Sequence, residues 1–363
     1  MKEQDFICES TPEQVIQGKV TWQSPSNIAL VKYWGKKENQ IPANPSISFT
    51  LNNCKTTTSI DFLPKNSSAK KNNAFDFEFY FEGKKKEEFK PKINTFFERI
   101  VSYCPFLKEI QLTIHSENSF PHSSGIASSA SGMSALALCV MSIEKELFPT
   151  ISDEYFYQKA SFLARLGSGS ACRSVKGEMV VWGEHEGIEK SSDLYGVPYD
   201  DEVHEIFSNY QDTILLVDKG EKQVSSSVGH NLMHGHPFAE QRFKQAHTNL
   251  SKLKTVFKEG DLKKFIEIVE SEALTLHAMM MSSNPYFILM KPNTLEIINK
   301  IWQYRESTGL PVCFTLDAGA NVHVLYPNKN KTEILEFIKN ELVVHCQAQQ
   351  FILDNVGLGS KKL

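Results

Sequence analysis

Small residues cluster where an expected strand gives way to an expected long helix. Residues 120–132 read FPHSSGIASSASG, and the helix is expected over 128–147. Such side chains let an anion approach the backbone, and the free N–H groups at a helix start can bind phosphate. A tight turn followed by small-residue helix packing is the better explanation for a lone segment of this kind. The phosphate reading therefore depends on the other segments.

A second segment concentrates hydrogen-bond donors. Residues 24–36 read SPSNIALVKYWGK, and residues 44–48 read NPSIS. The ammonium groups of Lys32 and Lys36 and the hydroxyl of Tyr33 lie close together in sequence, which suits a polyanionic substrate. Taken without their neighbours, these residues are better explained as the basic end of a surface strand.

Two more segments supply a guanidinium group and a carboxylate. Residues 164–174 read ARLGSGSACRS, in which glycines permit a tight backbone, and the hydroxyl of Ser170 and the side chain of Arg173 can face one pocket. Residues 314–322 read FTLDAGANV and place Asp317 between two expected strands. An aspartate at a strand end is usually a turn residue, so its chemistry also depends on context.

The elements that must position these residues alternate between strands and helices. Strands are expected at 19–23, 28–31, 46–62, 75–82, 110–116 and 177–183, and helices at 93–103, 128–147 and 153–165. A polar insertion at 64–73 and an acidic linker at 190–208 interrupt the pattern. Beyond the linker we expect strands at 212–218, 312–317, 321–326 and 350–353, and helices at 240–258, 261–277, 294–307 and from 331. The pattern alone indicates a mixed α and β protein.

Together the four segments resemble one family. The run Pro-x-x-x-Gly-Ile-Ala-Ser-Ser-Ala at 121–130 is similar to the phosphate loop of the GHMP small-molecule kinases. The other three segments resemble motifs of its decarboxylase branch, the diphosphomevalonate decarboxylases, and the likeness covers residues 17–345. It implies an α+β, two-part GHMP-kinase-like fold. A ribosomal-S5-domain-2-like N-terminal unit would span residues 1–200, and a ferredoxin-like C-terminal unit would span 201–363.

The resemblance also implies a reaction and a site. The enzyme would be a carboxy-lyase that converts 5-diphosphomevalonate and ATP to isopentenyl diphosphate, ADP, phosphate and CO2, with magnesium carried by ATP and no protein metal cage. Asp317 would activate the C3 hydroxyl, Lys32 would stabilise the transferring phosphate, and Arg173 would hold the C1 carboxylate. The remaining substrate contacts would be Tyr33, Lys36, Ser170 and Ser226, and the ATP contacts would be Ser123, Gly125, Ala127, Ser128 and Ser129.

Departures from the family pattern leave alternatives open. Residues 122–124 read HSS where Thr-Ala-Ala is usual, and Ala320 stands where proline is common. The arginine that the family directs at the diphosphate has only Lys90, Lys92 and Arg99 as candidates. A monophosphorylated substrate, a kinase of mevalonate or 5-phosphomevalonate, and a non-catalytic homologue therefore remain alternatives. The last would be expected to have lost Asp317, Lys32 or Arg173.

The composition describes an ordinary globular protein. Of 363 residues, 41% are hydrophobic and 23% charged, and the net charge of −4 indicates neither a nucleic-acid nor a membrane partner. Seven scattered cysteines without a C-x-x-C pair suit a reducing cytoplasm. We expect a cytoplasmic enzyme whose partners are small molecules, with a homodimer left open.

Overall fold

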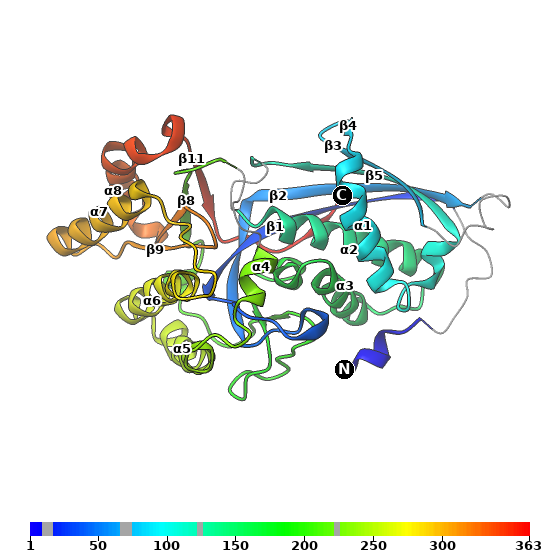
Figure 1. Cartoon of the computed structure of the whole chain (residues 1–363), viewed down its shortest axis with the longest axis horizontal. Coiled ribbons are helices and arrows are strands. Elements are labelled where there is room, and N and C mark those ends of the chain that lie inside the picture. The colour runs from blue at the N-terminus through cyan, green and yellow to red at the C-terminus, as the bar shows by residue number, and fades with distance from the viewer. Residues whose placement is uncertain (9–16, 66–74, 122–125, 221–225) are drawn as a thin grey trace.

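Two β-sheets lie side by side in an elongated molecule, each with helices packed against it (Figure 1). The computed structural model describes residues 1–8, 17–65, 75–121, 126–220 and 226–363, without the side chains of residues 226 and 227. Most of the insertion expected at 64–73 falls outside these ranges. The α+β class with two units is confirmed: the first sheet is mixed and the second is antiparallel.

The first sheet has eight strands, ordered β12-β1-β2-β5-β3-β4, with β6 paired to β2 and β7 paired to β6. In chain order these are β1 (Gly18–Val31), β2 (Ser46–Pro64), β3 (Asp76–Phe81), β4 (Lys84–Lys85), β5 (Ile110–Asn118), β6 (Met179–Trp182), β7 (Val197–Pro198) and β12 (Lys361–Lys362). The period of two expected near residue 77 is confirmed, since Phe77, Phe79 and Phe81 are buried while the residues between them are not.

The expectation of two short strands at 19–23 and 28–31 was wrong. A single strand, β1, crosses Pro25, and its register with β2 shifts between Pro25 and Asn27. Proline has no N–H to donate to a neighbouring strand, and an irregularity of this kind accommodates it without ending the strand. The consequence is a continuous strand that carries its C-terminal end into the centre of the molecule.

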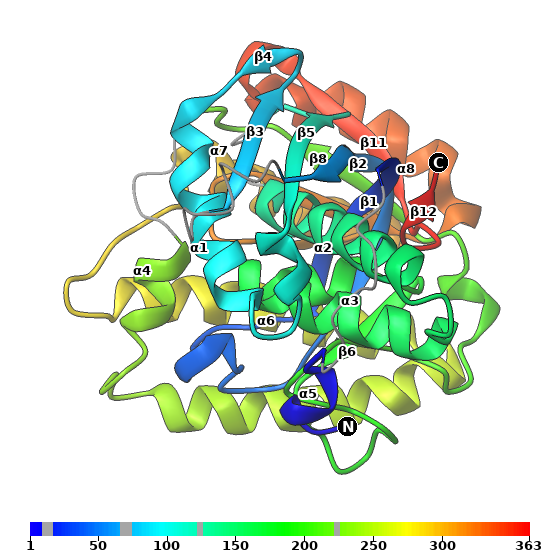
Figure 2. The same cartoon turned by 90° about the vertical axis from the view of Figure 1, so that its right-hand side faces the viewer.

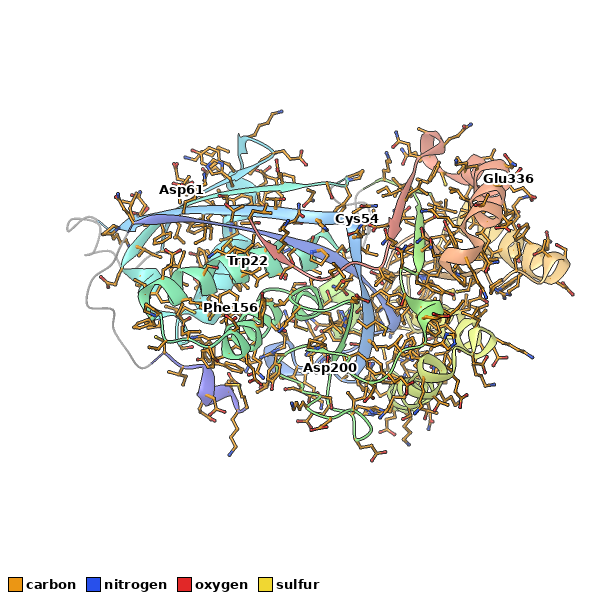
Figure 3. The ribbon with its side chains drawn as sticks, turned by 180° about the vertical axis from the view of Figure 1, so that it is seen from behind. Trp22, Cys54, Asp61, Phe156, Asp200 and Glu336 are labelled. Atoms are coloured by element: carbon orange, nitrogen blue, oxygen red, sulfur yellow. The ribbon has the colours of Figure 1, made fainter. Side chains whose placement is uncertain are left out.

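Three helices cover one face of the first sheet: α1 (Lys90–Ile100), α2 (Ser128–Leu147) and α3 (Asp153–Gly167) (Figure 2). The helix predicted at 128–147 begins and ends where expected. Trp22 of β1 stacks on Phe156 of α3 with ring centroids 5.8 Å apart, and its indole N–H donates to Ser142 Oγ of α2 (Figure 3). These contacts join both helices to β1.

The second sheet has the order β11-β8-β10-β9. Its strands are β8 (Gln211–Leu215), β9 (Cys313–Thr315), β10 (Val322–Tyr326) and β11 (Phe351–Asn355). The helices of this half are α4 (Ser226–Asn231), α5 (Ala239–Glu259), α6 (Leu262–Met281), α7 (Pro292–Thr308) and α8 (Lys331–Phe337). Helix α6 packs against both β9 and β1, so it touches both halves of the molecule.

The two halves are tied together at the sheets as well. The buried carboxylate of Asp354 in β11 accepts hydrogen bonds from the backbone N–H groups of Asn52, Asn53 and Cys54 in β2. Cys54 lies where the two sheets meet (Figure 3). After β11 the chain returns to the first half, where β12 pairs antiparallel with Trp22 and Gln23 of β1. Within the described ranges, no helix is long and apolar enough to cross a membrane.

Candidate active site

A lysine and an aspartate from opposite halves of the chain meet at the centre of the site. Lys32 directly follows β1, and Asp317 lies in the turn between β9 and β10. The Nζ atom of Lys32 lies 3.3 Å from Oδ1 of Asp317. The lysine side chain is only 1% exposed and the aspartate side chain 27%, so the ammonium group is enclosed while the carboxylate remains accessible to a substrate.

Two opposing effects act on the proton affinity of Lys32. Burial favours the neutral amine, whereas the negative charges of Asp317 and Glu272 favour the ammonium. Burial is the larger effect, so the pKa of Lys32 is held below that of an ordinary lysine. Lys32 therefore loses its proton at a lower pH than an ordinary lysine does.

Arg173 lies in the short 3₁₀ helix Gly169–Ser174 and is fixed from several sides. Its Nη1 donates to Ser46 Oγ at 2.6 Å, its Nε and Nη2 each donate to Asn27 Oδ1 at 3.4 Å, and the guanidinium lies 5.8 Å from the ring centroid of Trp182. It is 3% exposed, and the negative charge of Asp317 acts on it. A rigid guanidinium beside a lysine–aspartate pair can orient a planar carboxylate.

A histidine that the sequence analysis missed lies beside these residues. The ring of His230 in α4 lies 4.2 Å from that of Tyr33, and its Nδ1 accepts a hydrogen bond from the N–H of Gly35 at 3.0 Å. Burial, together with the positive charges of Lys36 and Arg173, lowers the pKa of His230 to about 3, so the imidazole is neutral. Its position three residues after the serine run 225–227 was the one available signal.

Several positive groups surround this neutral ring. The pKa of Lys36 is lowered by burial and by the positive charge of Arg99 in α1, which places Lys36 within electrostatic reach of that arginine. Arg99 Nη1 donates to the carbonyl of Leu166 at 2.9 Å, which fixes its guanidinium. Cations held near one another are suited to a multiply charged anion.

The start of α2 opens onto a pocket that the sequence analysis did not foresee. The pocket spans about 580 Å³, part of which is open solvent. It is lined by residues of β2, β3, β5, α1 and α2 and by Phe89, which directly precedes α1; among the others are Phe79, Phe81, Lys92, Ile93, Ile114, Ser128, Ser129 and Met133. Lys92 Nζ donates to Ser129 Oγ at 3.0 Å. A flat apolar group can occupy such a pocket while an attached anion meets the helix start.

The first turn of α2 has no side-chain cap among the described residues. Its N-cap residue, Ala127, has a left-handed conformation with φ of 44°, and among the described residues no side chain accepts a capping hydrogen bond there. By contrast, Ser152 caps α3 by accepting a hydrogen bond from the N–H of Tyr155. Because the N–H of Ala130 donates to the Ala127 carbonyl at 2.7 Å, the N–H groups left for a ligand are those of Ser128 and Ser129.

Other proteins are similar to this chain in sequence and in fold. Residues 24–193 match the model of the diphosphomevalonate decarboxylase-like N-terminal domain, and residues 213–360 match that of the mevalonate 5-diphosphate decarboxylase C-terminal domain. The diphosphomevalonate decarboxylase of Gibberella zeae is 30% identical over 326 residues, which cover 85% of this chain and 80% of that protein. The chain belongs to the diphosphomevalonate decarboxylase family.

Solved structures of the family extend the match to the whole fold. The mevalonate diphosphate decarboxylase of Staphylococcus aureus superposes with a TM-score of 0.80 at 28% identity, covering 96% of this chain and 98% of that one. A structure of MDDEF in complex with MVAPP, AMPPCP and magnesium also gives a TM-score of 0.80 at 28% identity, covering 96% of this chain and 99% of the other. The family expected from the sequence is thereby confirmed.

Most of the site residues expected by resemblance to the diphosphomevalonate decarboxylases lie in one of two places in the structure. Lys32, Tyr33, Arg173 and Asp317 gather at one centre with Lys36 close by, and Ser128 and Ser129 begin α2. Ser170 contributes its backbone carbonyl, which accepts from Asn27 Nδ2 at 3.2 Å. Ser123, Gly125 and the side chain of Ser226 lie outside the described residues. In the described ranges, no cluster of three or more His, Cys, Asp or Glu side chains is placed to hold a metal.

Proposed function

We propose that the Lys32–Asp317 pair is the chemical centre of an ATP-dependent decarboxylase acting on mevalonate diphosphate. Family membership establishes the reaction class, a carboxy-lyase. The observation that supports this centre is the 3.3 Å contact between an enclosed ammonium and an accessible carboxylate, beside a fixed guanidinium. A carboxylate can accept the proton of a hydroxyl while the neighbouring cation offsets the negative charge of a transferring phosphate.

The two chemical steps need different groups. A tertiary hydroxyl is a poor leaving group, so the Asp317 carboxylate takes its proton while the oxygen attacks the terminal phosphate of ATP, releasing ADP. When the new phosphate departs with the C3–O electron pair, positive charge builds at C3. The electrons of the breaking C1–C2 bond then form the double bond, and the carboxylate leaves as CO2. Arg173 holds that carboxylate in line until it leaves.

ATP is assigned to the start of α2 and the adjoining pocket. The N–H groups of Ser128 and Ser129, the Ser129 hydroxyl and the Lys92 ammonium suit the phosphates, and the apolar walls suit the adenine ring. Magnesium would accompany ATP and neutralise charge on its phosphates, and the carboxylate of Asp317, 27% exposed, is of the oxygen type that could ligate it. A related structure holds AMPPCP and magnesium.

We assign the diphosphate to the cations near His230 and choose Arg99 among the three candidates of α1. Lys90 forms an ion pair with Glu87 at 3.0 Å, and Lys92 bonds to Ser129 at the start of α2. Arg99, by contrast, acts electrostatically on Lys36. A second phosphate would therefore lie between Arg99 and Lys36, which favours the diphosphate over the monophosphate as substrate.

An incubation with ATP tests the reaction. With mevalonate 5-diphosphate we expect ADP, phosphate and CO2 in equal amounts. ADP without CO2 would indicate a kinase. Faster turnover of mevalonate 5-phosphate than of the diphosphate would contradict the substrate assignment.

Arg99→Gln tests the diphosphate site. Loss of a hydrogen bond to a charged group should raise KM for mevalonate diphosphate about 10- to 100-fold and change KM for ATP much less. Lys90→Gln, a matched loss of charge on the same helix, should leave both values near those of the parent. If the two variants behave alike, Arg99 is not the diphosphate ligand.

We also propose a cytoplasmic location. The seven cysteines all lie in the described ranges, and none forms a disulfide. Free, mostly buried thiols of this kind suit a reducing compartment.

A further inference from the structure

The backbone of Lys32 is held by side chains on both of its polar groups. Its N–H donates to Glu272 Oε2 at 2.9 Å, and its carbonyl accepts from Arg242 Nη2 and from Asn44 Nδ2, each at 3.0 Å. Glu272 belongs to α6 and Arg242 to α5, whereas Lys32 follows β1 of the other half. The backbone of Lys32, in the first half of the molecule, is therefore held by side chains of the second half.

Glu272 and Arg242 are themselves a fully buried ion pair. Their side chains have no measurable exposure, and Arg242 Nη1 donates to Glu272 Oε1 at 2.9 Å. Asn249 Nδ2 also donates to that oxygen, at 2.7 Å. A buried ion pair rarely stabilises a fold more than apolar side chains of the same size would. Apolar side chains, however, could not bond to the N–H and carbonyl groups of Lys32.

The same helix also reaches the other member of the catalytic pair. His277, five residues after Glu272 on α6, lies with Nε2 3.2 Å from the backbone carbonyl of Asp317. Burial lowers the pKa of His277 to about 4, so the ring is neutral, and the carbonyl partner requires the proton on Nε2. One helix therefore contacts the backbones of both Lys32 and Asp317.

We propose that Glu272 and Arg242 are positioning residues for catalysis: through the backbone of Lys32 they hold its ammonium group against Asp317, with α6 as the common support. The rate of such a reaction depends on how accurately the reacting groups are placed. A displacement of about 1 Å, even one caused by a mutation far from the reacting atoms, can reduce the rate about 100-fold. The proposal rests on the function assigned to the Lys32–Asp317 pair.

The charge of Glu272 gives the proposal a second readout. The groups that act electrostatically on Lys32 are Asp317 in the β9–β10 turn, Glu272 on α6 and Arg173 in its 3₁₀ helix, and Lys32 in turn acts on His277 and on Asp212 of β8. Among them Glu272 favours the protonated lysine. Without that charge Lys32 should lose its proton at a lower pH.

Three variants separate positioning from plain stability. Glu272→Gln removes the charge and keeps the size, and Arg242→Lys keeps the charge but loses the planar group that bonds to the Lys32 carbonyl. Glu144→Gln is the control, because Glu144 also forms a buried ion pair, with Lys159, near the far end of α2. Glu144 lies sixteen residues beyond Ser128 on α2, roughly 24 Å away along the helix.

We expect Glu272→Gln to reduce kcat about 10- to 100-fold, to change KM for ATP only a fewfold, and to move the alkaline limb of the kcat profile to lower pH. Arg242→Lys should reduce kcat to a similar extent without moving that limb. Glu144→Gln should lower the melting temperature but change neither kcat nor the pH at which the alkaline limb falls.

Each outcome decides the matter. If both site variants are folded and keep the parent kcat and pH profile, the proposal is wrong. If they lose activity only in proportion to their folded fraction, the ion pair is structural and the proposal is wrong. If Glu272→Gln does not fold, Arg242→Lys decides through kcat alone. If all variants fail while the parent shows no decarboxylation, the assigned function fails instead.

Discussion

Asp317 is the residue on which the proposed chemistry depends most directly. It is the accessible member of an ion pair whose other member is enclosed, so a substrate hydroxyl can reach the carboxylate while the ammonium stays behind it. The sequence could not indicate this arrangement by spacing, since 285 residues separate the two partners. Only the likeness of residues 314–322 and 24–36 to family motifs predicted that they would meet.

Asp317→Asn should keep the fold and bind both substrates, yet lose about 100- to 10,000-fold in kcat. The amide preserves size but cannot take the hydroxyl proton, and Lys32 can become neutral because its pKa is already lowered. ADP and CO2 should fall together, since phosphorylation precedes elimination. Measure both products on a variant shown to be folded by circular dichroism. Turnover within a fewfold of the parent would remove Asp317 from the mechanism.

Lys32 should set an alkaline limit on activity. Because burial lowers its pKa, the ammonium is lost as pH rises through a value below that of a free lysine. We therefore expect kcat to decline with rising pH before the ordinary lysine range is reached, while the protein is still folded. A profile that stays flat up to the pH at which circular dichroism detects unfolding would contradict this.

At the scale of elements, the start of α2 could be predicted from the sequence, whereas the pocket beside it could not. Helix α2 was predictable because its small N-terminal residues and its apolar positions belong to one continuous segment. The pocket is lined by residues of β2, β3, β5, α1 and α2, so it exists only once these elements have packed together. The hydrogen bond from the N–H of Lys32 to Glu272 of α6 could not be predicted for the same reason, because Glu272 lies 240 residues further along the chain.

The uncapped start of α2 predicts that the hydroxyl of Ser129 serves a ligand. Ser129→Ala should raise KM for ATP about 2- to 10-fold, the effect of losing one hydrogen bond, and leave KM for mevalonate diphosphate almost unchanged. Ser152→Ala is the matched control, since Ser152 caps its own helix α3. That change should lower stability by about 1 kcal/mol without affecting either KM. Equal changes in both KM values for Ser129→Ala would argue against the ATP assignment.

At the scale of the whole molecule, the two halves are interlocked by the path of the chain. An acidic, loop-like stretch predicted a boundary between two units at residue 200. The two family models match residues 24–193 and 213–360, on either side of residue 200. No sequence pattern indicated that β12 would return to β1, because a two-residue strand of exposed lysines has no periodicity to detect.

Deleting residues 361–363 should destabilise the protein without reducing activity at room temperature. The deletion removes the pairing with β1, including the bond from the Leu363 N–H to the Thr21 carbonyl, and should lower the free energy of unfolding by about 1–3 kcal/mol. The urea midpoint should fall. Replacing Lys361 and Lys362 by alanine keeps the backbone pairing and should leave the midpoint unchanged. An equal fall in that control would assign the effect to side chains.

The return of β12 also sets an order for how the protein can be made. A ribosome synthesises β1 early and β12 only after all the other described strands, so the outer edge of β1 at Trp22 and Gln23 has no native neighbour until residues 361 and 362 have been made. Unpaired strand edges are sites of aggregation, and this one would be open longest in a slowly translated chain. The pairing of Trp22 and Gln23 therefore waits for residues more than 330 positions further along the chain, and a chain interrupted before residue 361 leaves that part of the edge open.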